Sequence, residues 1–249
     1  MTKSDIRFVR SLADRYARTE YGLFIAEGEK LIAELLASPL RIRRIYSLDG
    51  AFDTLGECVE RVSQSEMERI SQLKTPASAL AVAECPQRSL RSADPSRSLV
   101  LALDGVQNPG NLGTIMRLAD WFGITKIVCS EDCADCFNPK VVQATMGAII
   151  RVGVHYTDLA SWLAAQRRTG VPVYGTFLDG EEIYTAELTP WGVIVMGSEG
   201  RGIGSECAAS VSRRLLIPPY PAGRHGSESL NVAIAAAVVC AEFRRRARL

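Results

Sequence analysis

The chain of 249 residues is 47% hydrophobic and 23% charged, an ordinary globular composition that excludes a largely disordered protein. Its net charge of +1 gives no overall electrostatic signature of nucleic-acid binding, and its longest apolar run, residues 232–241, is too short to span a bilayer. Seven cysteines in a chain without a signal peptide predict reduced thiols and a cytoplasmic protein. Cys133 and Cys136 form a lone CxxC pair, and because no second pair of ligands accompanies it, we expect two incidental thiols and no metal site.

The N-terminal part of the chain has the pattern of a small α/β domain. Its predicted elements are a strand that runs into a helix (24–36), a strand (43–48), a short helix (65–73) and a strand (80–85). Ser63 or Ser65 is the candidate cap of the short helix. The segment 91–98 is polar, contains a proline and lacks periodicity, which predicts a linker. We therefore expect one domain over residues 1–92 and a second over residues 97–249.

In the second domain, strand-like and helix-like segments alternate regularly. The predicted strands are 99–103, 126–129, 151–155, 172–177, 193–196 and 214–217. The predicted helices are 112–122, 141–150, 159–168, 205–210 and 230–246. The strands are continuous apolar runs, and such strands alternating with helices predict an α/β fold with a mostly parallel sheet and helices on both faces.

Polar loops follow three of these strands. The first begins at Asp104 and contains Asn108-Pro-Gly-Asn111, and Arg117 lies six residues farther along the predicted helix. Asn111 could simply cap that helix, whereas Arg117 lies less than two turns up and can stay near the mouth of the loop. The loop lacks the GxGxxG pattern of a dinucleotide site.

The second loop begins Gly197-Ser-Glu199-Gly, and the third ends Ser229-Leu-Asn231. The second lacks the GxSxG spacing of a serine hydrolase, and Glu199 could serve only to stabilise the N-terminus of the next helix. Ser229 is a candidate cap of the last helix. Loops at the ends of neighbouring parallel strands form a ligand crevice, which makes these segments the candidate functional site.

Together the three loops resemble the signature motifs of the SpoU/TrmH family, the RNA 2′-O-ribose methyltransferases of the SPOUT class. The segment 137–148 is similar to the family's Asn-Pro-Lys helix, and residues 24–30 resemble its small substrate-binding domain. The resemblance implies a C-terminal methyltransferase domain with a trefoil knot, a small N-terminal α/β domain that binds RNA, and a homodimer formed through the C-terminal domain.

The resemblance also implies a reaction and its residues. S-adenosylmethionine would supply a methyl group for a ribose 2′-hydroxyl in rRNA or tRNA, with no metal required. The implied cofactor contacts are Gly197, Ile217 and Leu230, and the implied catalytic cluster is Asn111, Arg117, Glu199, Ser229 and Asn231. The family proposal makes Arg117 the general base, but a guanidinium normally stays protonated, so Arg117 could instead hold a phosphate or stabilise the developing alkoxide.

Three alternatives remain open from the sequence: a base-directed SPOUT tRNA methyltransferase, a non-catalytic RNA-binding scaffold of the same fold, and an unrelated α/β nucleotide-binding enzyme. Clusters of cations could contact RNA or be solvated helix faces; they comprise Lys3, Arg7, Arg10, Arg15, Arg18, Arg41, Arg43, Arg44, Arg244, Arg245, Arg246 and Arg248. The loop 218–228 is a few residues longer than is usual in the family, and we expect its Arg224, beside His225, to contact an RNA phosphate.

Overall fold

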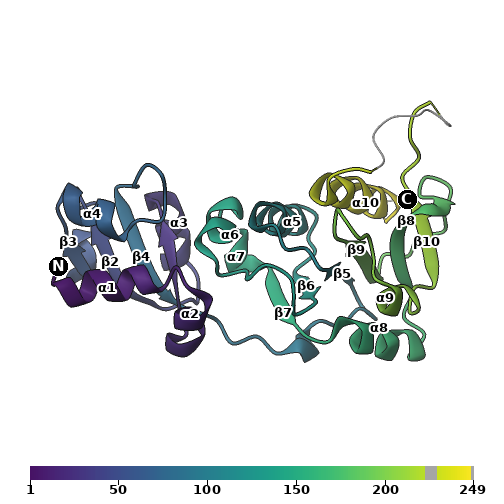
Figure 1. Ribbon diagram of the computed structural model, residues 1–249, viewed down its shortest axis with the longest axis horizontal. Coiled ribbons are helices and arrows are strands. Elements are labelled where there is room, and N and C mark those ends of the chain that lie inside the picture. The colour runs from purple at the N-terminus through teal and green to yellow at the C-terminus, as the bar shows by residue number, and fades with distance from the viewer. Residues whose placement is uncertain (222–228, 248–249) are drawn as a thin grey trace. The chain divides into compact units, whose positions relative to one another are not determined.

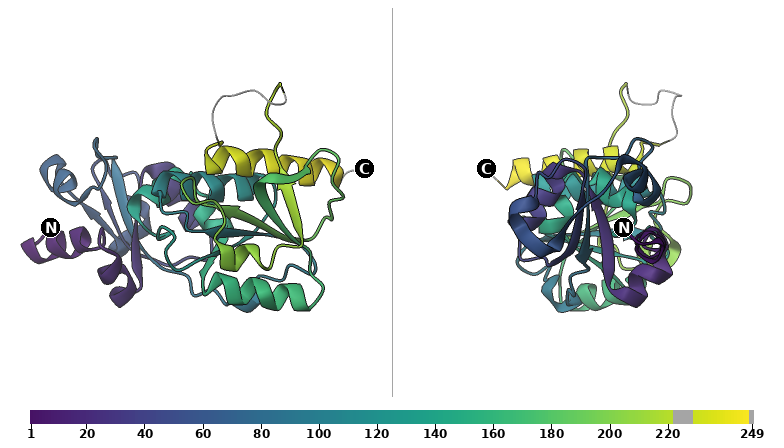
Figure 2. Two further views of the ribbon diagram at one scale, coloured as in Figure 1. Left: turned by 45° about the vertical axis from the view of Figure 1, so that its right-hand side comes forward. Right: turned by 90° about the vertical axis from the view of Figure 1, so that its left-hand side faces the viewer.

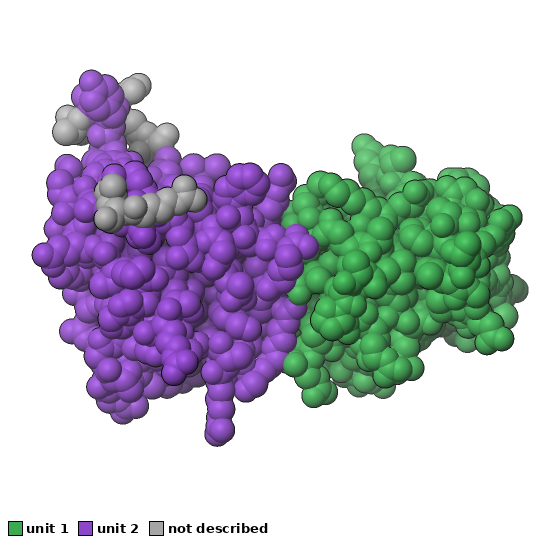
Figure 3. All heavy atoms as spheres, turned by 180° about the vertical axis from the view of Figure 1, so that it is seen from behind, with its two compact units in different colours: residues 1–87, 135–150 green, residues 88–134, 151–249 purple. Residues whose placement is uncertain are grey.

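The computed structural model describes residues 1–221 and 229–247. It divides into two compact units, one formed by Met1–Gln87 with Asp135–Ile150 and the other by Arg88–Ala134 with Arg151–Leu249 (Figure 3). Among the described residues, no helix is both long and apolar enough to cross a membrane. The two units are described separately below.

The first unit is built on a four-stranded sheet of order β1-β4-β2-β3, in which β4 is antiparallel to both neighbours and β2 is parallel to β3 (Figure 1). Its strands are β1 (Leu23–Glu27), β2 (Ile42–Ser47), β3 (Val59–Arg61) and β4 (Ala79–Glu84). Its helices are α1 (Lys3–Ser11), α2 (Arg15–Tyr21), α3 (Glu29–Leu36), the 3₁₀ helix η1 (Asp53–Cys58), α4 (Gln64–Ile70), α6 (Pro139–Ala144) and α7 (Ala148–Arg151). The strands and helices predicted within residues 24–85 are confirmed, whereas α1, α2, η1 and β3 were not predicted.

Reciprocal capping fixes the start of two short helices in this unit. In α1, Thr2 Oγ1 accepts a hydrogen bond from Asp5 N (3.1 Å), and the Asp5 carboxylate accepts one from Thr2 N (2.9 Å). Ser63 and Glu66 repeat this arrangement at α4, so Ser63 rather than Ser65 is the cap. Capping of this kind satisfies backbone donors that a short helix would otherwise leave free.

The segment 135–150 belongs to the first unit through side-chain contacts. The rings of Phe24 and Phe137 lie 5.0 Å apart, and Arg18 forms an ion pair with Asp135 at 2.5 Å. Arg18 is only 4% exposed and also donates hydrogen bonds to the carbonyl oxygens of Leu12 (2.9 Å) and Ala13 (2.7 Å). Arg18 is therefore a structural residue and not one of the surface cations.

The predicted helix over 141–150 is instead two short helices, α6 and α7. They are separated where Met146 and Gly147 adopt positive φ angles of 49° and 91°. Positive φ is incompatible with a right-handed helix and is unusual for a residue with a side chain. The break is a backbone property that hydrophobic periodicity does not reveal.

The second unit contains a six-stranded sheet of order β10-β8-β9-β5-β6-β7 in which every pair of neighbours is parallel (Figure 1). Its strands are β5 (Leu99–Asp104), β6 (Lys126–Cys129), β7 (Gly153–Tyr156), β8 (Val173–Glu182), β9 (Gly192–Gly197) and β10 (Arg213–Leu216). Its helices are η2 (Leu90–Ser92), α5 (Pro109–Trp121), α8 (Leu159–Arg168), α9 (Ser205–Ala208) and α10 (Val232–Arg246). The prediction of an α/β fold with a mostly parallel sheet is confirmed.

Helices cover both faces of this sheet. Figure 2 shows α5 and α10 side by side on one face and α8 and α9 on the other. Strands β5 and β9 are buried on both faces, which explains why their sequences are continuous apolar runs. Hydrophobic burial on two faces makes the centre of this sheet the best-fixed part of the unit.

Strands β5 and β9 lie together at the centre of the sheet although 87 residues separate the end of β5 from the start of β9. After β5 the chain adds β6 and β7 towards one edge of the sheet, and β8, β9 and β10 then lie on the opposite side of β5 in the strand order. Asp104 at the end of β5 is paired in register with Gly197 at the end of β9. The loops after both strands therefore leave the same edge at a reversal of strand order, where α/β sheets bind their ligands.

The described arginines of the C-terminal cluster are held within the second unit, and Arg248 lies outside the described residues. Arg244 donates hydrogen bonds to the carbonyl oxygens of Phe122 (2.6 Å) and Gly123 (3.1 Å), at the end of α5. Arg245 and Arg246 both pair with Glu242, and the hydrogen bond from Arg245 is the main cause that lowers the pKa of Glu242 to about 2. These cations stabilise helix ends, as expected for positive charges near a C-terminus.

We predict that Arg18→Ala lowers the free energy of unfolding of the first unit by about 2–4 kcal/mol, because it leaves Asp135 and two carbonyl groups without their donor. The matched control is Arg61→Ala, which removes the same charge from an exposed ion pair with Asp53 and should change stability little. Urea denaturation of both variants is the measurement. Equal losses in the two variants would show that burial of Arg18 contributes nothing.

Candidate functional site

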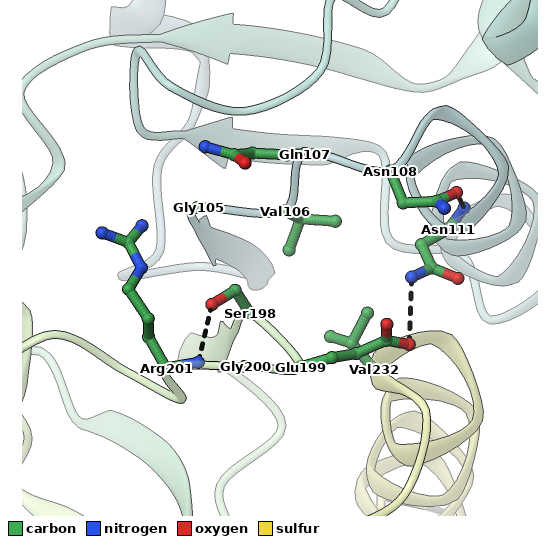
Figure 4. A pocket seen from close by; sticks show the side chains of 10 residues that line it. All are labelled: Gly105, Val106, Gln107, Asn108, Asn111, Ser198, Glu199, Gly200, Arg201 and Val232. Atoms are coloured by element: carbon green, nitrogen blue, oxygen red, sulfur yellow. Dashed lines mark hydrogen bonds between the residues drawn. The ribbon is translucent and has the colours of Figure 1, made fainter.

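A pocket of about 370 Å³ lies at the carboxyl ends of β5 and β9 (Figure 4). Its walls come from the loop after β5 with the first turn of α5, the loop after β9, and the start of α10. The lining residues are Gly105, Val106, Gln107, Asn108, Asn111, Ser198, Glu199, Gly200, Arg201 and Val232. The pocket is thus formed mainly by glycines and by polar side chains that can donate and accept hydrogen bonds.

Three side chains from three separate loops meet beside this pocket. Asn111 Nδ2 donates to Glu199 Oε1 at 3.1 Å (Figure 4), and Asn231 Nδ2 donates to Asn111 Oδ1 at 3.0 Å. Asn231 Nδ2 also donates to Glu199 Oε1. The structure therefore brings together three of the residues predicted for the site, and we call them the Asn-Glu-Asn cluster.

The helix caps differ from two of the sequence-based interpretations. Asn108 caps α5, because its Oδ1 accepts hydrogen bonds from the backbone N–H of Gly110 (2.8 Å) and Asn111 (3.2 Å). The alternative that Asn111 is only a cap is therefore wrong: α5 begins at Pro109, three residues earlier than predicted. Asn111 consequently lies within the first turn, with its side chain directed to Glu199.

Asn231, and not Ser229, caps α10. Asn231 Oδ1 accepts hydrogen bonds from the backbone N–H of Ala233 (3.0 Å) and Ile234 (3.2 Å). The interpretation of Ser229 as the cap is wrong because the helix begins at Val232. Asn231 thus uses its oxygen to hold the helix and its Nδ2 group to hold the Asn-Glu-Asn cluster.

The loop that carries Glu199 is closed on itself by backbone hydrogen bonds. Ser198 N donates to the Gly202 carbonyl at 3.1 Å, and Gly202 N returns a bond to the Ser198 carbonyl at 2.8 Å. Asp104 Oδ2 accepts a further bond from Gly204 N at 2.7 Å. A side chain at position 197 would collide with the backbone of Gly202 and Ile203, so the turn requires glycine at 197.

A second set of contacts joins the loop after β6 to the other two loops. Ser130 Oγ accepts a hydrogen bond from Gly105 N (2.9 Å) and donates to Asp132 Oδ1 (2.6 Å), and Asp132 pairs with Arg201 at 3.0 Å. The hydrogen bond from Ser130, followed by the contact with Arg201, lowers the pKa of Asp132. The buried Cys133 accepts a hydrogen bond from Val106 N at 3.2 Å.

Sequence analysis missed the roles of Ser130, Asp132 and Arg201 and treated Cys133 as an incidental thiol. A signal existed, because residues 130–133 directly follow the strand predicted over 126–129. The rule that polar residues after a central parallel strand belong to a site would have included them. Hydrogen bonding, with the contact to Cys129 first, lowers the pKa of Cys133 to about 7, which matches a thiol held as a hydrogen-bond partner.

The remaining predicted residues lie outside the pocket lining. Arg117 is exposed on α5, and its side chain makes no hydrogen bond or ion pair with any residue that the structure describes. Ser229 is exposed and Leu230 is 48% exposed, whereas Ile217 is half-buried directly after β10. Arg224 and His225 lie outside the described residues, so the structure does not test the prediction for their loop.

The arrangement offers hydrogen-bonding groups and close backbone approach. The cluster presents a carboxylate held by two amides, and the glycines at 105 and 200 let a ligand approach the main chain. Within residues 1–221 and 229–247, no group of three or more His, Cys, Asp or Glu side chains is placed to hold a metal ion. Such a site suits the orientation of a polar substrate.

Comparison with known proteins identifies relatives over nearly the whole chain. Residues 98–241 match the model of the SpoU rRNA Methylase family, and residues 3–81 match the MRM3-like substrate binding domain. The chain is 32% identical to the 23S rRNA guanosine 2′-O-methyltransferase RlmP of Bacillus subtilis over 94% of both chains. Among solved structures it resembles a TrmH-family protein from Porphyromonas gingivalis (TM-score 0.89, 42% identity, 99% of each chain). It also resembles an AdoMet-bound rRNA methyltransferase from Sinorhizobium meliloti (TM-score 0.89, 28% identity, 99% of this chain and 96% of that chain).

We predict that Gly197→Ala destabilises the second unit by about 2 kcal/mol or more. The added methyl group would overlap the backbone of Gly202 and Ile203, and Gly202 is held by two backbone hydrogen bonds with Ser198. Gly200→Ala is the matched control, since a Cβ at position 200 meets nothing within 4 Å. Thermal unfolding should show a lower midpoint for Gly197→Ala and a midpoint near wild type for Gly200→Ala. Equal midpoints would mean that the loop can shift to accept a side chain at 197.

Proposed function

This chain belongs to the SpoU rRNA Methylase family, and on that premise we propose that it transfers the methyl group of S-adenosylmethionine to a ribose 2′-hydroxyl of RNA. The observation that carries the proposal is the Asn-Glu-Asn cluster, which joins all three motif loops beside one pocket. The relatives that match more than nine-tenths of this chain include RlmP of Bacillus subtilis and RlmB of Coxiella burnetii, both named as 23S rRNA 2′-O-methyltransferases. We therefore propose ribosomal RNA as the substrate.

The pocket exposes backbone at Gly105 and Gly200, and the three residues proposed to contact the cofactor lie outside its lining, at the ends of β9 and β10 and before α10. When bound, S-adenosylmethionine supplies the electrophilic methyl group, so the protein has only to position the acceptor and manage its proton. Gly197, Ile217 and Leu230 would contact the cofactor. The accessible apolar side chains of Ile217 and Leu230, which suit a purine ring, support this assignment.

Methyl transfer also requires a group that accepts the proton of the 2′-hydroxyl. Glu199 Oε1 accepts both amide hydrogen bonds of the cluster, and Glu199 Oε2 makes no hydrogen bond with any described residue. We assign to Glu199 Oε2 the hydrogen bond from the 2′-hydroxyl, because a carboxylate accepts bonds at both oxygens. Asn111 and Asn231 would fix the carboxylate in orientation, and Ser229 lies two residues from Asn231 on an exposed segment.

Arg117 would stabilise negative charge on the substrate and would not remove the proton of the 2′-hydroxyl. A guanidinium is a poor general base because it has no free electron pair to accept a proton in its ordinary cationic form. Arg117 is exposed, without a partner among the described residues, and six residues from Asn111 on the same helix. We propose that Arg117 holds the substrate phosphate or stabilises the developing alkoxide.

We also propose that this chain forms a homodimer and contains a trefoil knot, as the family resemblance implies. Trp121 at the end of α5 is 83% exposed and Ile234 on α10 is 54% exposed, and these two helices pack against each other. Large exposed apolar side chains on adjacent helices support a homodimer interface on this domain. The return of the chain from the edge strand β10 to α5 and β9 supports a trefoil knot in the second unit. The match of residues 3–81 to the MRM3-like substrate binding domain supports RNA binding by the first unit.

We predict that ribosomal RNA incubated with methyl-labelled S-adenosylmethionine and the wild-type protein yields label in 2′-O-methyl nucleosides after complete digestion. Arg117→Ala should reduce this transfer at least about 100-fold, because a charge that stabilises the transition state is lost, while cofactor affinity stays within a few-fold. Arg97→Ala, which removes an 87% exposed arginine from the same unit, is the control and should transfer normally. Label on the bases would reject ribose specificity, and normal transfer by Arg117→Ala would reject the role of Arg117.

A further inference from the structure

The first unit carries a basic groove between α1 and α4. This groove has a volume of about 320 Å³ and is lined by Lys3, Ile6, Arg7, Arg10 and Arg69. Ile6 is 4% exposed and forms the floor, whereas the four cations are exposed. Four of the five lining residues are positively charged and none is acidic, in a chain whose net charge is only +1.

Helix geometry explains the convergence of these cations. Lys3, Arg7 and Arg10 are spaced by four and three residues, which places them on one face of α1. Arg69 comes from the last turn of α4, far along the sequence, and packing of α4 against α1 adds it to the same groove. The sequence grouped the N-terminal cations with Arg15 and Arg18 and gave no sign of Arg69.

The four cations are not neutralised by the protein. Their side chains make no hydrogen bond or ion pair with residues 1–221 or 229–247. Other arginines of this unit behave differently, because Arg18, Arg43 and Arg61 pair with Asp135, Glu84 and Asp53, respectively. Like charges gathered around one groove repel one another, and an anionic partner relieves that repulsion.

The dimensions of the groove indicate an extended anion. Lys3 and Arg10 are seven residues apart on α1, which corresponds to about 10 Å along the helix axis. A single phosphate ion cannot reach both ends of that row, whereas consecutive phosphates of a nucleic-acid strand can. The lining contains no aromatic side chain on which a base could stack, and its cations are of the kind that contact phosphates.

We propose that the α1–α4 groove binds the phosphate backbone of the substrate RNA at two or more consecutive phosphates, without sequence specificity. This proposal rests on the proposed function, because it assumes that RNA is the substrate. The groove would raise the affinity of the protein for RNA and would not accelerate methyl transfer once RNA is bound.

The test compares two double variants that remove the same charge from the same unit. Arg7→Ala with Arg10→Ala removes two groove cations, and Arg43→Ala with Arg61→Ala removes two paired cations outside the groove lining. Binding of a fluorescent RNA hairpin of arbitrary sequence is titrated at several salt concentrations. For the groove variant we expect the log–log salt slope to fall by about 1.4–2 units and the affinity at low salt to fall about tenfold or more. The control variant should keep the wild-type slope.

Methyl transfer to ribosomal RNA separates this proposal from the function on which it rests. The groove variant should show a raised KM for RNA, with kcat and the affinity for S-adenosylmethionine near wild type. Equal salt slopes for the groove variant, the control variant and the wild type would overturn the groove proposal. Wild-type protein that binds the hairpin but methylates no RNA would overturn the proposed function and leave the groove as an RNA-binding surface. Thermal unfolding of both variants verifies that each is folded.

Discussion

The candidate site depends on a constraint at Asn231, whose amide must satisfy two structures at once. Its Oδ1 holds the first backbone N–H groups of α10, and its Nδ2 holds Asn111 and Glu199. An amide is the side chain that provides an acceptor and a donor in this fixed relation. Displacement of α10 would therefore withdraw Asn231 from the cluster and leave the Glu199 carboxylate held by Asn111 alone.

The sheet supplies the framework that makes this constraint possible. Because β5 and β9 are central, parallel and in register, their carboxyl ends deliver Asp104 and Gly197 to the same level. Asp104 then fixes the far end of the Glu199 loop through Gly204. The loop after β6 supports the loop after β5 through Ser130 and the Glu199 loop through the ion pair of Asp132 with Arg201. The polar groups at the site are thus held by a rigid scaffold, which is the requirement for a preorganised catalytic cluster.

The sequence predicts the parallel sheet well, because strands that are buried on both faces have continuous apolar sequences. The loops that contain glycine and asparagine follow these apolar runs directly. The sequence is less informative about features that depend on tertiary packing, such as helix caps and residues that converge from different elements. The capping role of Asn108 became evident only once α5 was seen to begin at Pro109, and Arg69 joins the basic groove only through the packing of α4 on α1. The burial of Arg18 likewise depends on Asp135, which lies 117 residues away in the chain.

The most direct test of the Asn-Glu-Asn cluster replaces Asn231 by Ser, with Asn231→Ala as the comparison. Serine caps a helix as well as asparagine does but is too short to reach Asn111 and Glu199, whereas alanine loses both functions. We expect Asn231→Ser to keep wild-type stability to within about 0.5 kcal/mol and to lose methyl transfer at least about 100-fold. Asn231→Ala should in addition be destabilised by about 1 kcal/mol. Methyl transfer by Asn231→Ser at a rate near that of the wild type would contradict the central role of the Asn-Glu-Asn cluster.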